Sequence, residues 1–269
     1  MQELSIFDFL PDEEAERFRP KKSTDWKWTF ADYPKEKNGL KVFSCFACGG
    51  GSTMGYKLAG CEVLGCCEID PKMNEVFNHI QSINPNVKFL FENVGMKKES
   101  EDIITNAFQY EPVKINSRLV SAQDRKRLYW TNFPFTIPED KHISASDLIG
   151  TGCVAGAMRG RRIDEFGKRN DSRKDLPIVQ QIECRKDNKF NCVTTVQKDN
   201  VIVASEQRFF PALTNRDKWR YLTANEAEKL QTLPAGYTDC VSEGARFKAI
   251  GNSWTVDVIA HILKSVVKA

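Results

Sequence analysis

A glycine-rich segment after a short apolar stretch is the first place where this sequence could do chemistry. Residues 48–52 read CGGGS directly after the strand-like Leu40–Ala47, and Glu68 stands near the end of a second apolar stretch, Glu62–Ile69. Glycines let a backbone approach a ligand closely, and an acid after the next strand accepts hydrogen bonds from a ribose diol. The pattern predicts an adenosyl cofactor without separating NAD from S-adenosylmethionine. A tight turn with a solvated Glu68 is the alternative.

Cysteines are the second group with chemical potential. Cys45 and Cys48 form a CxxC pair, but no second pair stands at zinc spacing, and His79, His142 and His261 are isolated. We therefore expect no metal site, and the pair fits as small residues of a buried strand and turn. Nine scattered cysteines in a 269-residue chain indicate reduced thiols in the cytoplasm. The acidic start of the chain and the lack of a long apolar run predict neither a secretory signal nor a membrane span.

Basic residues concentrate between Arg159 and Lys186, where nine basic side chains face five acidic ones, while the whole chain carries only +3. This balance is typical of a surface that binds phosphates, and a solvated loop is the alternative.

The elements that must position these groups alternate between strand and helix in the first half of the chain. Apolar residues make up 41% and charged residues 28% of the sequence, which is typical of a folded globular protein. The expected strands are Leu40–Ala47, Glu62–Ile69 and Phe89–Val94, and the expected helices are Thr53–Ala59, Asp70–Ile83 and Asp102–Gln109. After Pro134 the periodicity fades. A capping box of Thr223 and Glu226 then predicts a helix through Gln231, and an apolar stripe predicts a terminal helix at Thr255–Val267.

Several segments in one order give a more specific signal. They read FACGGGSTMGYKLAG, CEID, FLFENV, QDRKRLYW, RYLTANEAEKLQTLPAGY and GNSWTVDV. From about Val42 to the carboxyl terminus the chain resembles the C5-cytosine DNA methyltransferases. The resemblance implies an α/β fold with a doubly wound, Rossmann-like sheet. It also implies a division into an N-terminal extension at 1–38, a methyltransferase domain at 39–135 and 217–269, and an inserted target-recognition region at 136–216.

The resemblance assigns roles to individual residues. Those that would bind the cofactor S-adenosylmethionine are Phe46, Gly50, Gly51, Glu68, Ile69, Asn252, Ser253 and Trp254. Glu92 would contact the edge of an extruded cytosine, while Arg125 and Arg127 would position phosphate and base. The residues expected to bind DNA are Gln123, Arg159, Arg161, Arg162 and Arg220.

The chemistry of the residues agrees with these roles. A base inside a duplex must be extruded before an enzyme can reach it, and its exposed edge then needs a buried polar partner. To donate toward cytosine N3, Glu92 must hold a proton, which an apolar site favours. An ordinary acid at a strand end and a solvated arginine pair are the alternatives.

One departure from the family pattern concerns the nucleophile. The family carries a cysteine in a Pro-Cys loop between the ribose acid and the ENV segment, but no Pro-Cys dipeptide occurs in this chain, and only 24 positions separate Glu68 from Glu92. Two strands and the catalytic loop are therefore expected to be missing. Because their loss would leave an unpaired edge, we expect Phe89–Val94 to pair with Leu40–Ala47.

The resemblance favours a DNA cytosine-5 methyltransferase, cytoplasmic in a bacterial or phage-infected cell, that acts on double-stranded DNA. A complementing polypeptide or a cognate restriction enzyme would be its further partners. The alternatives are an inactive or split homologue that binds DNA or S-adenosylmethionine, and a Rossmann-like dehydrogenase.

Overall fold

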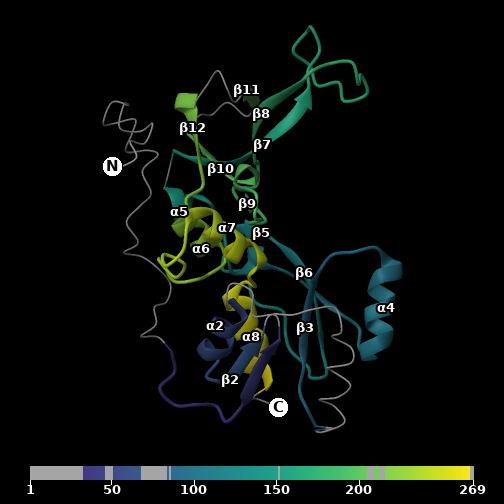
Figure 1. Ribbon diagram of the computed structural model, residues 1–269, viewed down its shortest axis with the longest axis vertical. Coiled ribbons are helices and arrows are strands. Elements are labelled where there is room, and N and C mark those ends of the chain that lie inside the picture. The colour runs from purple at the N-terminus through teal and green to yellow at the C-terminus, as the bar shows by residue number, and fades with distance from the viewer. Residues whose placement is uncertain are drawn as a thin grey trace.

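The structure is a computed structural model of the 269-residue chain (Figure 1). It describes residues 33–45, 51–67, 84, 86–150, 152–204, 209–211 and 216–266. Most of the expected extension at 1–38 and the expected helix Asp70–Ile83 lie outside these ranges. Within them, no helix is both long enough and apolar enough to cross a membrane.

A parallel strand–helix–strand unit stands next to the expected cofactor loop. Strand β1 (Lys41–Cys45) pairs with β2 (Glu62–Cys67), and α2 (Gly51–Leu58) lies between them in the sequence. Parallel strands need a crossover connection, which a helix commonly supplies. A Cβ at Gly55 of α2 would come within 2.6 Å of the Ile259 Cβ, so this glycine allows close packing of α2 on the terminal helix.

That terminal helix, α8 (Val256–Val266), lies beside α2 in the lower half of the view (Figure 1). Its buried Val258, Ile259 and Ile262 share one core with Tyr56 of α2 and Tyr129. The apolar stripe in the sequence had to face a core, because an exposed stripe of this size would be unfavourable. The predicted terminal helix is confirmed.

A second sheet holds the segment that carries Glu92. Strands β3 (Leu90–Val94) and β4 (Val113–Asn116) both pair antiparallel with β6 (Lys126–Thr131), which is therefore central. Our expectation that Phe89–Val94 pairs with Leu40–Ala47 is wrong. Among the described residues, β3 pairs with β6 and β1 pairs with β2, because the aromatic side chains beside β3 find their partners on β6 and on helix α4 (Lys98–Phe108).

The two faces of β6 pack against different helices. Side chains alternate along a strand, so Leu128 and Trp130 point to the face opposite Tyr129. Trp130 and Leu128 pack with Phe108 of α4, and the Trp130 Nε1 donates a hydrogen bond to Thr105 Oγ1 at 3.0 Å. Tyr129 joins the α8 core instead. The sheet is thus buried between α4 and α8.

The expected recognition region contains a five-stranded sheet at the other end of the molecule (Figure 1). Its strand order is β11-β8-β7-β10-β12, and all its pairs are antiparallel. The strands are β7 (Val154–Arg162), β8 (Ile178–Cys184), β10 (Val201–Val203), β11 (Phe209–Pro211) and β12 (Trp219–Tyr221). Since β12 pairs with β10, this sheet extends past the expected domain boundary at 216.

Several short elements, including the one-turn helix α5, and the longer helices α6 and α7 join the two ends of the molecule. They are η3 (Ser117–Leu119), β5 (Gln123–Asp124), α5 (Ser146–Ile149), β9 (Phe190–Asn191), η4 (Gln197–Asp199), η5 (Arg216–Lys218), α6 (Ala224–Leu230) and α7 (Glu243–Asn252). The predicted capping box is confirmed: the Thr223 side chain accepts from Glu226 N, and the Glu226 carboxylate accepts from Thr223 N. Each bond satisfies a main-chain donor that the helix itself leaves unpaired.

Candidate active site

Glu92 and Arg127 form an ion pair on one face of the central sheet. Glu92 lies opposite Tyr129 in the pairing of β3 with β6, and Arg127 stands two residues before Tyr129, on the same face. Arg127 Nε lies 2.9 Å from Glu92 Oε1, and the two side chains are only 13% and 9% exposed. Glu92 Oε1 is buried and accepts no well-aligned hydrogen bond from the described residues.

Burial changes the proton affinity of this carboxyl group. It raises the pKa of Glu92, although the positive charges of Arg127 and Arg125 act in the opposite direction. Burial also raises the pKa of Tyr129, and the neighbouring Glu92 charge adds to that shift. A carboxyl group that holds its proton more readily can donate a hydrogen bond, which an ordinary surface glutamate at neutral pH cannot do.

Arg125 is buried, and main-chain oxygens accept most of its hydrogen bonds. Its guanidinium donates to Val193 O at 3.1 Å, to Ser253 O at 2.8 Å and to Gly251 O at 3.4 Å. This arginine therefore ties the start of β6 to two distant segments of the chain. The structure places it as a positioning residue rather than on a surface that a phosphate could reach.

Gln123 has the same kind of role. Its side chain is 0% exposed, with Nε2 donating to Leu230 O at 2.5 Å and to Gln231 Oε1 at 2.9 Å, while Oε1 accepts from Val193 N at 3.1 Å. Gln231 in turn donates to Ile250 O. Its amide is used inside the protein, and the expected contact of Gln123 with DNA stays a prediction.

Two of the residues expected to bind the cofactor are in contact. A Cβ at Gly51, the first residue of α2, would come within 2.0 Å of Ser253 Oγ and 2.5 Å of Trp254 O. Ser253 Oγ is buried and has no hydrogen-bond partner among the described residues. Asn252 lies beside them and is exposed. Phe46, Gly50, Glu68 and Ile69, which complete the expected set, lie outside the described residues.

Residues 96–268 match the family model for the C-5 cytosine-specific DNA methylases. The chain belongs to this family. The matched segment includes Arg125, Arg127 and the network around Ser253, whereas Glu92 and Gly51 precede it.

Relatives of the chain are methyltransferases as well. DNA (cytosine-5)-methyltransferase DRM2 of Oryza sativa subsp. japonica is 24% identical over 182 residues, which are 65% of this chain and 30% of the rice protein. The chain thus spans only 30% of the length of this curated relative.

Solved structures show the same fold. The Dnmt2 methyltransferase of S. pombe superposes with a TM-score of 0.53 at 15% identity, covering 85% of this chain and 98% of that one. Entamoeba histolytica methyltransferase EhMeth gives 0.51 at 16% identity, covering 87% and 99%. These likenesses confirm the expected α/β methyltransferase fold class.

Within residues 136–216, most of the arginines that we expected to bind DNA are paired with acids. Arg159 binds Asp199, and Arg161 binds Glu183 through two hydrogen bonds of 2.5 and 2.8 Å. Arg162 makes no ion pair with a described residue, and its Nε is buried without a hydrogen-bond partner there. The basic segment is therefore less free to bind phosphate than its composition predicts, because neighbouring strands supply the acids.

Arg220 is also internal. It forms a bidentate ion pair with Glu226 at 2.8 and 2.7 Å, and both side chains are about 95% buried. The pair braces β12 against the capped start of α6, and the expected contact of Arg220 with DNA stays a prediction.

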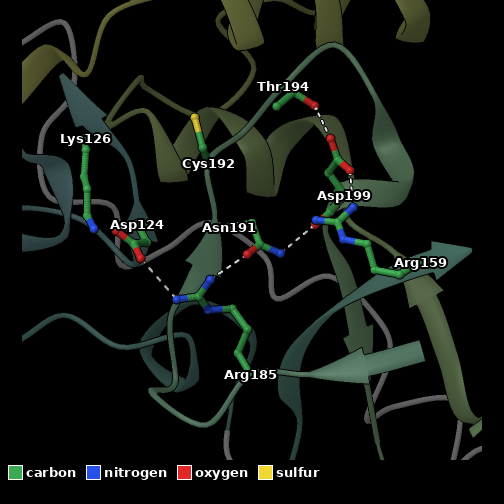
Figure 2. A pocket seen from close by; sticks show the side chains of 8 residues that line it. All are labelled: Asp124, Lys126, Arg159, Arg185, Asn191, Cys192, Thr194 and Asp199. Atoms are coloured by element: carbon green, nitrogen blue, oxygen red, sulfur yellow. Dashed lines mark hydrogen bonds and ion pairs between the residues drawn. The ribbon is translucent and has the colours of Figure 1, made fainter. Parts of the chain in front are cut away.

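A polar pocket of about 400 Å³ opens between β5, β7 and the segment after β9 (Figure 2). It is lined by Asp124, Lys126, Arg159, Arg185, Asn191, Cys192, Thr194 and Asp199. A chain of hydrogen bonds crosses it from Asp124 through Arg185 and Asn191 to Asp199.

Sequence reasoning singled out only Arg159 among these lining residues. The pocket brings together β5, β7 and the segment around Cys192, which are far apart in the sequence, and no local pattern indicates that they meet. No cluster of three potential metal ligands occurs within the described part of the chain.

Proposed function

We propose that this chain transfers a methyl group from S-adenosylmethionine to C5 of cytosine in double-stranded DNA. The observation that carries the proposal is the buried Glu92 carboxyl group, with its raised pKa and with Arg127 Nε at 2.9 Å. A buried carboxyl group with a raised pKa, next to a fixed guanidinium, is suited to recognise the polar edge of a base that has left its duplex.

Glu92 acts first as a hydrogen-bond donor. In its protonated form it donates toward N3 of the extruded cytosine, and the proton moves toward N3 as the ring becomes electron-rich. Arg127 holds the carboxyl group in place from the same sheet face. Because Arg125 and Gln123 anchor the start of β6 on both sides, Arg127 has little freedom to move away.

The residues around α2 fit the proposed cofactor. The first turn of α2 presents main-chain N–H groups, Gly51 leaves no side chain in the way, and the unpaired Ser253 Oγ is a buried polar atom that a ligand can satisfy. Asn252 and Trp254 would complete this side of the site. Phe46, Gly50, Glu68 and Ile69 are assigned to it by their place in the family pattern. S-adenosylmethionine, when bound, supplies an electrophilic methyl group.

DNA is the proposed partner of the recognition region. Arg162, which makes no ion pair with a described residue, is its best-placed charged contact, and Arg159 and Arg161 could exchange their acidic partners for phosphates. Binding through such charges should weaken steeply with salt. We include in the proposal a cytoplasmic setting and a cognate restriction enzyme that cleaves unmethylated sites.

Labelled S-adenosylmethionine and mixed-sequence duplex DNA test the proposal. We expect label at cytosine C5, and we expect Glu92→Gln to reduce incorporation by about 100-fold or more because the amide has no proton to give. Glu111→Gln, at an exposed acid on the loop before β4, is the control and should behave as the parent protein. Absence of label with DNA and S-adenosylmethionine both bound would refute the proposed activity.

A further inference from the structure

A cysteine thiol lies between the two arginines of the candidate site. Cys192 directly follows β9, and its Sγ accepts from Arg125 Nη1 at 3.1 Å and from Arg127 Nη2 at 3.7 Å. The side chain is half-buried and lines the polar pocket of Figure 2. Reactive cysteines are found in such partly exposed sites with positive charge, whereas structural cysteines lie in apolar surroundings.

The same guanidinium connects this thiol to Glu92. Arg127 meets Cys192 through Nη2 and Glu92 through Nε, two atoms of one planar group. Cys192 Sγ and Glu92 Oε1 are therefore at most about 9 Å apart. In cytosine, N3 and C6 occupy opposite corners of the ring, so an acid that serves N3 and a thiol that attacks C6 must stand on opposite sides of the base.

Glu92 gives independent support for a ligand at this place. Its side chain is more than nine-tenths buried, and apart from the 2.9 Å ion pair with Arg127 Nε its Oε1 accepts no well-aligned hydrogen bond from the described residues. Buried polar atoms are almost always hydrogen-bonded, so this carboxylate oxygen, held by the guanidinium that also reaches the thiol, can accept or share a hydrogen bond with a further polar partner.

We propose that Cys192 is the nucleophile that adds to C6 of the target cytosine. This inference rests on the proposed methyltransferase function and assigns the thiol role to a residue of the recognition region. No Pro-Cys loop is present to supply the thiol from elsewhere.

The proposed reaction conserves atoms and electrons at each step. The Cys192 thiol loses its proton to solvent, and Sγ forms a bond to C6 while the C5–C6 π electrons become the nucleophilic pair at C5 and N3 takes the proton of Glu92. The methyl group that C5 takes up would come from bound S-adenosylmethionine, whose sulfur would keep the electron pair of the broken S–CH3 bond. Loss of the C5 proton to water re-forms the double bond and expels the thiolate, and Glu92 regains its proton.

The fold holds Cys192 firmly enough for this role. The next residue, Val193, donates its N–H to Gln123 and accepts from Arg125, so the main chain beside the thiol is fixed on both sides. Asn191, on the other side, bonds to Arg185 and to Asp199 O. A nucleophile held in this way loses little freedom when it attacks.

Two assays with the full chain test the proposal: methyl transfer to duplex DNA, and release of tritium from cytosine C5 into water, which reports addition at C6. We expect Cys192→Ser to lower both by about 1,000-fold or more while it retains binding of S-adenosylmethionine and DNA. Cys184→Ser, at a cysteine of similar exposure on β8, is the matched control and should leave both unchanged. A duplex that contains 5-fluorocytosine should become covalently attached, and peptide mapping should place the adduct on Cys192.

Each outcome decides a different question. Methyl transfer by Cys192→Ser at the parent rate, or an adduct on another cysteine, would overturn the role of Cys192 and leave the methyltransferase function standing. A parent protein that neither methylates cytosine nor releases tritium would overturn both. Loss of both activities in Cys192→Ser alone, with binding intact, would establish the thiol as the nucleophile.

Discussion

Arg125 and Ser253 are joined by a 2.8 Å hydrogen bond, from Nη2 of the arginine to the main-chain oxygen of the serine, across 128 positions of the sequence. The bond connects the strand that carries Arg127 to the segment that meets the start of α2. The base side and the cofactor side of the candidate site therefore share one fixed point.

Arg125→Lys should break this connection. A lysine has the charge but not the planar fork of donors, so the oxygens of Val193, Gly251 and Ser253 cannot all be satisfied. We expect the free energy of unfolding to fall by about 2–4 kcal/mol and S-adenosylmethionine to bind about 10-fold more weakly. Urea unfolding and calorimetric titration measure the two effects. The control Arg173→Lys changes an exposed ion pair and should leave the free energy of unfolding nearly unchanged. Equal losses in both variants would argue against the connection.

Glu226→Gln should destabilise the protein more than any exposed charge change. The variant leaves Arg220 buried with a neutral partner, and it weakens the capping box of α6. We expect a loss of about 3–5 kcal/mol in the free energy of unfolding. Glu165→Gln, which alters an exposed pair with Arg173, should leave the free energy of unfolding nearly unchanged. A Glu226→Gln variant as stable as the parent in urea would show that the buried pair contributes no stability.

The stability conferred by Glu92 should depend on pH. Because its pKa is raised in the folded protein, the folded state binds the proton more tightly than the unfolded state. The free energy of unfolding therefore falls as pH rises from the ordinary glutamate pKa through the raised one. Glu92→Gln lacks this titration, so its stability relative to the parent protein should increase as the pH is raised across the range that starts at the ordinary glutamate pKa. A constant difference across that range would contradict the assignment.

Gly51→Ala should disturb the contact between α2 and the Ser253 segment. The new methyl group would meet Ser253 Oγ and the Trp254 oxygen at 2.0 and 2.5 Å, and the second of these is a main-chain atom. We expect a loss of about 1–3 kcal/mol in unfolding free energy and at least a 10-fold weaker binding of S-adenosylmethionine.

Gly244→Ala supplies the matched control, because no atom lies within 4 Å of its added Cβ. That change, in the first turn of α7, should be neutral or stabilise by about 0.5 kcal/mol. Thermal unfolding and ligand titration on both variants give the comparison, and an unaffected Gly51→Ala variant would remove Gly51 from the site.

Local patterns in the sequence predicted local structure correctly. The Thr223–Glu226 capping box and the apolar stripe of α8 involve residues within one or a few helical turns, so their spacing defines them. Glu92 and Arg127 were singled out through the family pattern. Their contact depends on the pairing of β3 with β6, which the sequence led us to misplace.

Long-range burial was the part that could not be predicted. The sequence around Gln123 and Arg220 does not indicate that their polar groups are used inside the protein. Their partners lie on other segments of the chain, and the contacts exist only once the chain has folded. For the same reason, the sequence around Cys192 did not indicate a role for this residue. Its significance comes from two arginines that stand more than sixty positions earlier.

The alternation along β6 makes this strand intolerant of a change in its length. Arg127 and Tyr129 face Glu92 and the α8 core, while Leu128 and Trp130 face α4. Deleting a single residue between Arg125 and Arg127 would move every later side chain of the strand to the opposite face. The indole of Trp130 would then enter the candidate site, and the guanidinium of Arg127 would enter the aromatic cluster beside α4. The match between side chains and faces of the sheet would be lost, although almost every amino acid was still present.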